Sequence, residues 1–179
     1  MNNRVMFAAL ILLLGIATTD AQQPYAGLQT RPIKALSPEQ IADLRNGRGM
    51  GMALAAELNG YPGPIHVLEL ADQLSLTPEQ QSRVEELVKA MTADTVPIGE
   101  KLISLEADMD HQFASGTMTL SYLEEATKTI GATQGSLRGA HLRYHLLTIA
   151  ELNPAQVRRY KELRGYKDAS HSPPHSGHH

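Results

Sequence analysis

The chain has 179 residues, of which 16 are Lys or Arg and 19 are Asp or Glu, so its formal net charge at pH 7 is −3. This slightly acidic balance argues against bulk binding of nucleic acid. The lack of cysteine excludes a disulfide framework, thiolate metal sites and cysteine nucleophiles. Any metal site must therefore use His, Met and carboxylate side chains.

The first 21 residues have the pattern of a secretory signal peptide. Arg4 precedes an apolar stretch from Val5 to Ala17, and Thr19-x-Ala21 fits the small residues that a signal peptidase recognises. The apolar stretch is shorter than the roughly 20 residues that a helix needs to cross a bilayer. We therefore expect an exported protein that begins at Gln22 and has no stable membrane insertion. An uncleaved anchor is the alternative.

One short pattern occurs three times along the chain: Leu-Ser-Pro-Glu-Gln at 36–40, Leu-Thr-Pro-Glu-Gln at 76–80 and Leu-Asn-Pro-Ala-Gln at 152–156. Each copy predicts the start of a helix. Ser, Thr or Asn supplies the N-cap oxygen, Pro stands at the first helical position, and Gln three residues after the cap can reach back to it.

The segment after Pro78 predicts a long amphipathic helix. Its apolar residues recur at three- and four-residue spacing from Val84 to Phe113. Pro97 interrupts this segment, removes one backbone hydrogen bond and clashes with the preceding turn. We therefore expect either a kink near Asp94 or two shorter helices.

A second long helix follows the break at Ser115-Gly116-Thr117. Either Thr119 or Ser121 caps it, and its apolar seam runs to about Ala150. Three glycines spaced by four residues (131, 135 and 139) place a smooth ridge on one of its faces, which either admits a close neighbour or weakens the helix. The two long elements should pack as an antiparallel hairpin.

Shorter helices are expected on both sides of this hairpin, and no segment shows the two-residue alternation of a strand. The predicted short helices are 38–45, 52–58, 64–73 and a last one from 154 that ends at Gly165. The predicted fold is all-α, with a long antiparallel helical hairpin and short flanking helices. We divide the chain into the signal peptide 1–21, short helices and linkers 22–62, a hairpin domain 63–166 and a disordered His-rich tail 167–179.

Histidines on the helices form the main candidate metal site. His141 and His145 are four residues apart, so they project from one helix face and could chelate one ion. A buried neutral imidazole, bonded to a neighbour, is the alternative for His141 because it lies on the apolar seam. His66 and Glu69 would complete the site if their helix packs against the second long helix.

The tail and one loop carry further candidate ligands. The tail places four imidazoles in its last nine residues, where a flexible chain could wrap a Zn, Cu or Ni ion, although a solvated polar tail is the alternative. They are His171, His175, His178 and His179. Met50 and Met52 could offer thioethers to Cu(I), but Met at a helix start more often fills a gap in packing.

Catalysis has little support in the sequence. The glycine-rich string 47–51 follows no strand and is not followed by Lys-Ser/Thr, so it is not a phosphate-binding loop. No Ser-His-Asp set in a motif context, no HExxH and no nucleophile elbow is present. We therefore expect a binding protein, not an enzyme, that requires no cofactor.

The repeated motif resembles the signature of the Spy/CpxP group, which includes zinc-resistance-associated proteins and heavy-metal sensors. Its hallmark is LTxxQ twice, once opening each half. The copy at 76–80 matches fully, and the copy at 152–156 has Asn in place of Thr, which keeps the capping function. The resemblance covers roughly Pro64 to Tyr166 and leaves Gln22 to Asn59 unexplained.

The resemblance implies a periplasmic stress-protection protein that forms a curved homodimer. Members of this group bind unfolded or misfolded envelope proteins without ATP, regulate membrane sensor kinases or bind heavy metals. In the nickel and cobalt sensors, imidazoles come from just before each motif, and His66 and His145 occupy those two neighbourhoods here, slightly displaced. A dedicated periplasmic metal-binding or metal-sensing protein without chaperone activity is the alternative function.

Overall fold

The computed structural model describes residues 25–166, and this part of the chain contains helices and no strand. The predicted all-α class is therefore confirmed. The predicted signal peptide and the four tail histidines (His171, His175, His178 and His179) lie outside the described residues. No helix within 25–166 is long and apolar enough to span a membrane.

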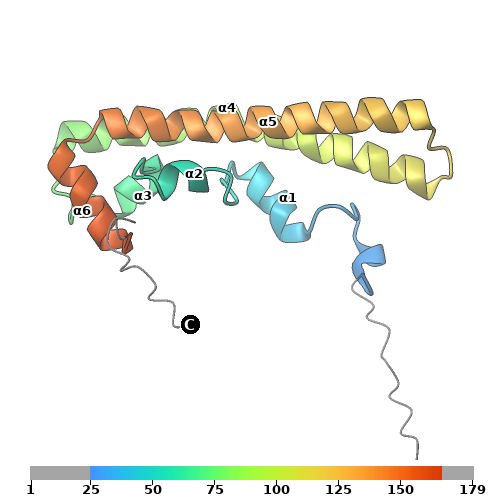
Figure 1. The fold of residues 1–179 in the computed structure, drawn as a ribbon, viewed down its shortest axis with the longest axis horizontal. Coiled ribbons are helices and arrows are strands. Elements are labelled where there is room, and N and C mark those ends of the chain that lie inside the picture. The colour runs from blue at the N-terminus through green and yellow to red at the C-terminus, as the bar shows by residue number, and fades with distance from the viewer. Residues whose placement is uncertain (1–24, 167–179) are drawn as a thin grey trace, which may run out of the picture.

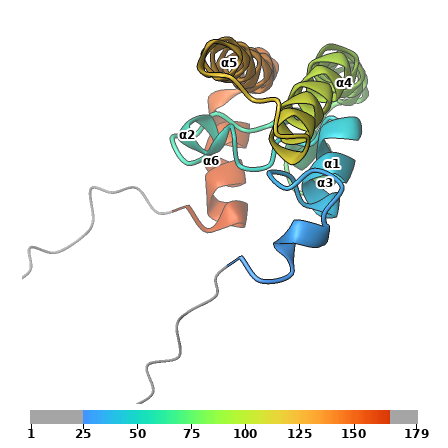
Figure 2. The same ribbon diagram turned by 90° about the vertical axis from the view of Figure 1, so that its right-hand side faces the viewer.

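Two long helices form the upper layer of the molecule (Figure 1). Helix α4 spans Pro78–Ala114 and α5 spans Leu120–Ala150. They lie side by side and run in opposite directions (Figures 1 and 2). Thr119, one of the two expected caps, accepts a hydrogen bond from the Tyr122 amide and begins α5.

The alternative of two shorter helices around Pro97 is wrong, because α4 continues through this residue. Proline leaves the carbonyl four residues earlier without its helical hydrogen bond. That carbonyl belongs to Ala93, and both Ala93 and Pro97 are exposed. Water can therefore satisfy the freed group, while α5 and α1 pack against the other faces of α4.

The short helices all lie beneath the two long ones. After a 3-10 turn at Leu28–Thr30 come α1 (Pro38–Arg45), α2 (Leu54–Glu57), α3 (Pro64–Glu69) and, at the other end of the chain, α6 (Pro154–Arg164). The end view places α1 and α3 under α4, and α2 and α6 under α5 (Figure 2). Helices α1 and α2, which fall in the segment 22–59 that the resemblance left unexplained, thus pack against the long helices.

Helix α3 is shorter than expected, because it ends at Glu69 and not at Gln73. The chain must reverse direction before Thr77 begins α4. It does so through hydrogen-bonded turns in which Ser75 adopts a left-handed conformation with φ 51°. Leu74, which lies within this reversal, is buried.

All three copies of the repeated pattern form complete capping boxes. Ser37, Thr77 and Asn153 each accept a backbone N–H with the side chain, and the glutamine three residues later accepts the N–H of the cap. Two of these glutamines also bond to each other. Gln80 Nε2 donates to Gln156 Oε1 at 3.0 Å, and Gln156 Nε2 donates to Gln80 Oε1 at 2.9 Å. The start of α4 is thereby joined to the start of α6.

The core consists of two apolar clusters below the long helices. The first joins α1 to the middle of α4 and α5, and it includes Leu44, Leu102 and Leu137. The second surrounds the fully buried Tyr160 of α6. Gly99 allows α1 to approach α4 closely, because a Cβ at this position would lie 2.6 Å from the Leu44 carbonyl oxygen. The space between these clusters holds the candidate site.

Candidate functional site

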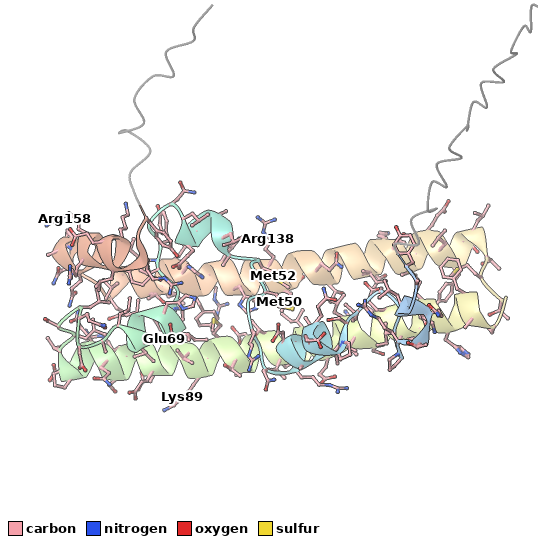
Figure 3. All side chains as sticks on the ribbon, turned by 90° about the horizontal axis from the view of Figure 1, so that it is seen from below. Met50, Met52, Glu69, Lys89, Arg138 and Arg158 are labelled. Carbon is pink, nitrogen blue, oxygen red and sulfur yellow. The ribbon has the colours of Figure 1, made fainter. Side chains whose placement is uncertain are left out.

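A pocket of about 440 Å³ opens on the underside of the molecule. Its walls come from the loop 48–51, from α2 and α3, from His145 on α5, and from Arg164 and Tyr166 at the end of α6. Met50 and Met52 lie below the middle of the long helices, and Glu69 lies closer to the α6 end (Figure 3). Segments from both ends of the described chain thus meet around one cavity.

His145 is fixed in one orientation at the pocket wall and is only 8% exposed. Its Nδ1 lies 2.6 Å from the Tyr61 carbonyl oxygen. Because a carbonyl can only accept, Nδ1 must carry the proton of the neutral ring, and Nε2 must carry a lone pair. A metal-binding imidazole commonly donates its other N–H to a backbone carbonyl in this way.

His66 has the corresponding arrangement on α3. Its Nδ1 lies 3.0 Å from Glu69 Oε2, so the carboxylate can hold the proton on Nδ1. The opposite edge of the ring faces Gly63, where an added Cβ would lie 3.7 Å from His66 Cδ2 and 3.1 Å from His145 Nε2. These two ring atoms are therefore less than 7 Å apart. Both imidazoles thus lie against Gly63 in the same pocket wall.

Glu57 on α2 is a buried carboxylate, 6% exposed, in the same pocket wall. Its Oε1 accepts hydrogen bonds from the Tyr160 hydroxyl and, at 3.0 Å, from the Tyr166 hydroxyl. Its Oε2 accepts the Gly63 N–H at 3.2 Å and lies 3.8 Å from His145 Nδ1. One acidic side chain thus links α2, the start of α3, α5 and α6.

His141 lies beside this pocket and does not line it. It is 3% exposed, its Nδ1 faces Gly49, and its Nε2 has no hydrogen-bond partner within the described residues. Burial, together with the neighbouring His145, lowers the pKa of His141, so the ring is neutral at pH 7. The loop containing Gly49 separates His141 from the pocket that His145 enters.

The predicted candidates therefore fall into three groups. His66 and His145 line the pocket, and Glu69 contacts His66 from outside it. His141 lies behind the loop, and the tail histidines lie outside the described residues. Within 25–166, no three or more His, Asp or Glu side chains are placed to hold one ion together. Chemically, the pocket offers two imidazole nitrogens and leaves other coordination positions to water or further ligands.

Sequence reasoning missed Glu57 and its partners on α6. A glutamate in the stretch Ala-Ala-Glu-Leu carries no motif. The tyrosines that bond to it are about a hundred residues away in the chain, as the separations of 103 and 109 residues show. Met50, which was considered for Cu(I), lines the pocket, whereas Met52 packs against the first apolar cluster.

Comparison of the chain with protein-family models, with curated proteins and with solved structures finds no match.

Proposed function

We propose that the protein is an exported, non-enzymatic protein of the periplasm that binds one Zn, Cu or Ni ion between His66 and His145. The observation that carries this proposal is the pairing of the two rings. Each has its Nδ1 next to an oxygen acceptor, which leaves Nε2 for a ligand, and both rings line one pocket and lie against Gly63. Imidazole nitrogens suit these three ions and not Mg²⁺ or Ca²⁺.

Two imidazoles alone give modest affinity, so further ligands matter. Water can fill open positions, and Met50 on the pocket wall offers a thioether that would favour Cu(I). The chain continues from Tyr166, itself in the pocket wall, into the His-rich tail. We propose that tail imidazoles deliver ions to the pocket.

A titration of the protein with Zn, Cu and Ni salts at pH 7 tests this function. We expect His66→Ala and His145→Ala each to weaken binding at one site at least tenfold. His111→Ala is the matched control, because His111 is an exposed histidine near the far end of α4. A version ending at Lys167 separates the tail from the pocket. If the two pocket variants bind as tightly as the control, the proposal is wrong.

The second candidate function is capture of unfolded envelope proteins, in keeping with the resemblance to the Spy/CpxP group. Its support is an apolar rim next to the ion site: Met50, Leu54 and Ile65 line the pocket and are 37%, 54% and 40% exposed. Exposed apolar side chains gathered at a cavity are suited to weak binding of apolar segments. In this proposal ion binding and client binding share one surface.

The oligomeric state and a kinase partner belong to the same proposal. The glycines 131, 135 and 139 form an open ridge on α5, with nothing in the described chain within 4 Å of an added Cβ. This ridge supports a homodimer in which a second copy covers α5, and sedimentation at several concentrations tests it. A membrane sensor kinase is the further partner in this proposal, because its sensor part would be in the periplasm, where we propose that this protein is located.

Client capture can be measured by the aggregation of a reduced, unfolding test protein. We expect substoichiometric amounts of this protein to slow aggregation, and Leu54→Ser with Ile65→Ser to remove the effect. Leu120→Ser is the matched control, since Leu120 is 80% exposed at the far end of the long helices. An equal loss of protection with the control variant would count against the rim as the binding surface.

A further inference from the structure

The buried carboxylate of Glu57 extends the proposed ion site to the C-terminal helix; this inference rests on the proposed function. Glu57 accepts hydrogen bonds from both tyrosines of the α6 region, Tyr160 in the second apolar cluster and Tyr166 in the pocket wall. Arg164 Nε is 3.7 Å away. Three polar contacts of the α6 region, besides its paired glutamines and its apolar cluster, therefore converge on one carboxylate.

The same charge is close to the place where an ion would bind. Glu57 Oε2 lies 3.8 Å from His145 Nδ1, so an ion on Nε2 of that ring, at a metal–nitrogen distance of about 2.1 Å, would be roughly 8 Å or less from the carboxylate. This separation is within one Debye length at physiological salt, and Glu57 and His145 are both buried, so screening between the ion and the carboxylate is weak.

We propose that Glu57 is a positioning residue of the ion site and that it couples ion binding to the docking of α6. A buried anion is stabilised by a nearby cation. An ion in the pocket therefore stabilises the arrangement in which the Glu57 carboxylate lies beside His145 and accepts the two tyrosine hydroxyls. By reciprocity, this docked state binds the ion more tightly than a state with α6 displaced.

The consequence is that ion binding in the pocket changes how firmly α6 is held. The loaded protein holds α6 and Tyr166 firmly, and the ion-free protein holds them less firmly. The pocket wall contributed by Arg164 and Tyr166 is thus the responsive part of the site.

The test uses zinc alone as the probe and two readouts on the full chain. The first is zinc affinity, for which we expect Glu57→Gln to weaken binding about 10- to 30-fold, the effect of removing a negative charge roughly 8 Å from the ion at an effective dielectric constant of about 20. The second is amide hydrogen exchange over 154–166, which we expect zinc to slow in the unmodified protein and to leave unchanged in Glu57→Gln. Equal zinc affinity, or equal slowing in both proteins, would overturn the proposal.

Two further variants separate this inference from a structural effect. Glu162→Gln removes an exposed negative charge on α6 and should change neither readout. Tyr166→Phe keeps the carboxylate and removes one of its donors, so zinc affinity should stay within about threefold while exchange of α6 becomes faster without zinc. If Glu57→Gln fails to fold, absence of zinc-induced slowing in the unmodified protein still overturns the coupling.

The failure of this inference is distinguishable from failure of the proposed function. Loss of zinc binding in His66→Ala and His145→Ala, with none in Glu57→Gln, would leave the ion site standing and remove only the coupling. Unchanged binding in both histidine variants would remove the site itself.

Discussion

Replacement of Gln156 with leucine measures how much the paired glutamines contribute to joining α4 and α6. The substitution removes both bonds between Gln156 and Gln80, the bond that Gln156 Nε2 donates to the Leu74 carbonyl oxygen at 3.4 Å, and the bond that its Oε1 accepts from the Asn153 amide. Gln156 is 7% exposed, so water cannot readily replace these partners.

The expected cost is about 3 kcal/mol of unfolding free energy. A hydrogen bond contributes about 1 kcal/mol net, and leaving a buried carbonyl such as that of Leu74 without a donor adds a further 1–3 kcal/mol. Leucine offsets part of this cost by burying apolar surface. For a chain of this size, 1 kcal/mol corresponds to roughly 2–4 °C in Tm, so the midpoint should fall by roughly 6–12 °C.

Urea unfolding followed by far-ultraviolet circular dichroism is the assay, with Gln134→Leu as the control because Gln134 is an exposed residue of α5. The double variant with Gln80→Leu should cost clearly less than the two single variants together, since each single change already breaks the shared pair. Additive costs, or a loss below 0.5 kcal/mol for Gln156→Leu, would refute the reasoning.

Three other substitutions test the packing and the charge of α4 and α5. Glu106 has a buried Oε2 without a partner in the described chain, and burial raises its pKa, so its charged form costs stability at pH 7 and this cost disappears as the pH falls towards 4. Glu106→Gln should therefore raise the unfolding free energy by about 1 kcal/mol at pH 7 and less at pH 4.5, as urea titrations at both pH values would show. Gly99→Ala should lower Tm, at a cost of about 1–3 kcal/mol, because its Cβ would collide with the Leu44 carbonyl oxygen. Gly135→Ala should increase the unfolding free energy by about 0.5–1 kcal/mol and so raise Tm, because open space surrounds Gly135 in the described chain. A lower Tm would indicate that a second copy packs there.

Local chemistry made the helix starts predictable. Ser37, Thr77 and Asn153 each stand one residue before a proline and three before a glutamine, and each forms the expected capping box. The boundaries of α1 at Pro38–Arg45 and of α5 at Ala150 follow from the same kind of signal. These features depend on residues within one turn of each other, so the sequence contains them directly.

Features that depend on solvent exposure or chain reversal were harder to predict. Pro97 was expected either to kink the helix or to divide it, and α4 is not divided, because the exposed position of Pro97 leaves the freed carbonyl open to water. Helix α3 ends before the chain reverses towards α4, and in that reversal Ser75 adopts a left-handed conformation for which its residue type carries no strong signal. Both outcomes were decided by the surroundings of the residue, which the local sequence does not reveal.

The candidate site was predictable in part. Helical spacing paired His145 with His141, and the packing of α3 near α5 was needed to add His66. In the structure His145 and His66 line the pocket, whereas His141 is covered by the loop at Gly49. A four-residue spacing puts two side chains on one helix face without saying what packs over each of them. The role of Glu57 depends on contacts across more than a hundred residues, which no local pattern contains.

The segment Pro62-Gly63-Pro64 has a consequence for how readily the pocket accepts an ion. Both prolines are buried, and their rings fix the backbone on either side of the glycine over which the two imidazoles meet. The conformational entropy of this stretch is lost when the chain folds, so binding of an ion has little further backbone to order. A larger residue in place of Gly63 would push the two imidazole rings apart without touching any helix. Ion binding could therefore be changed at this tripeptide while the fold is kept.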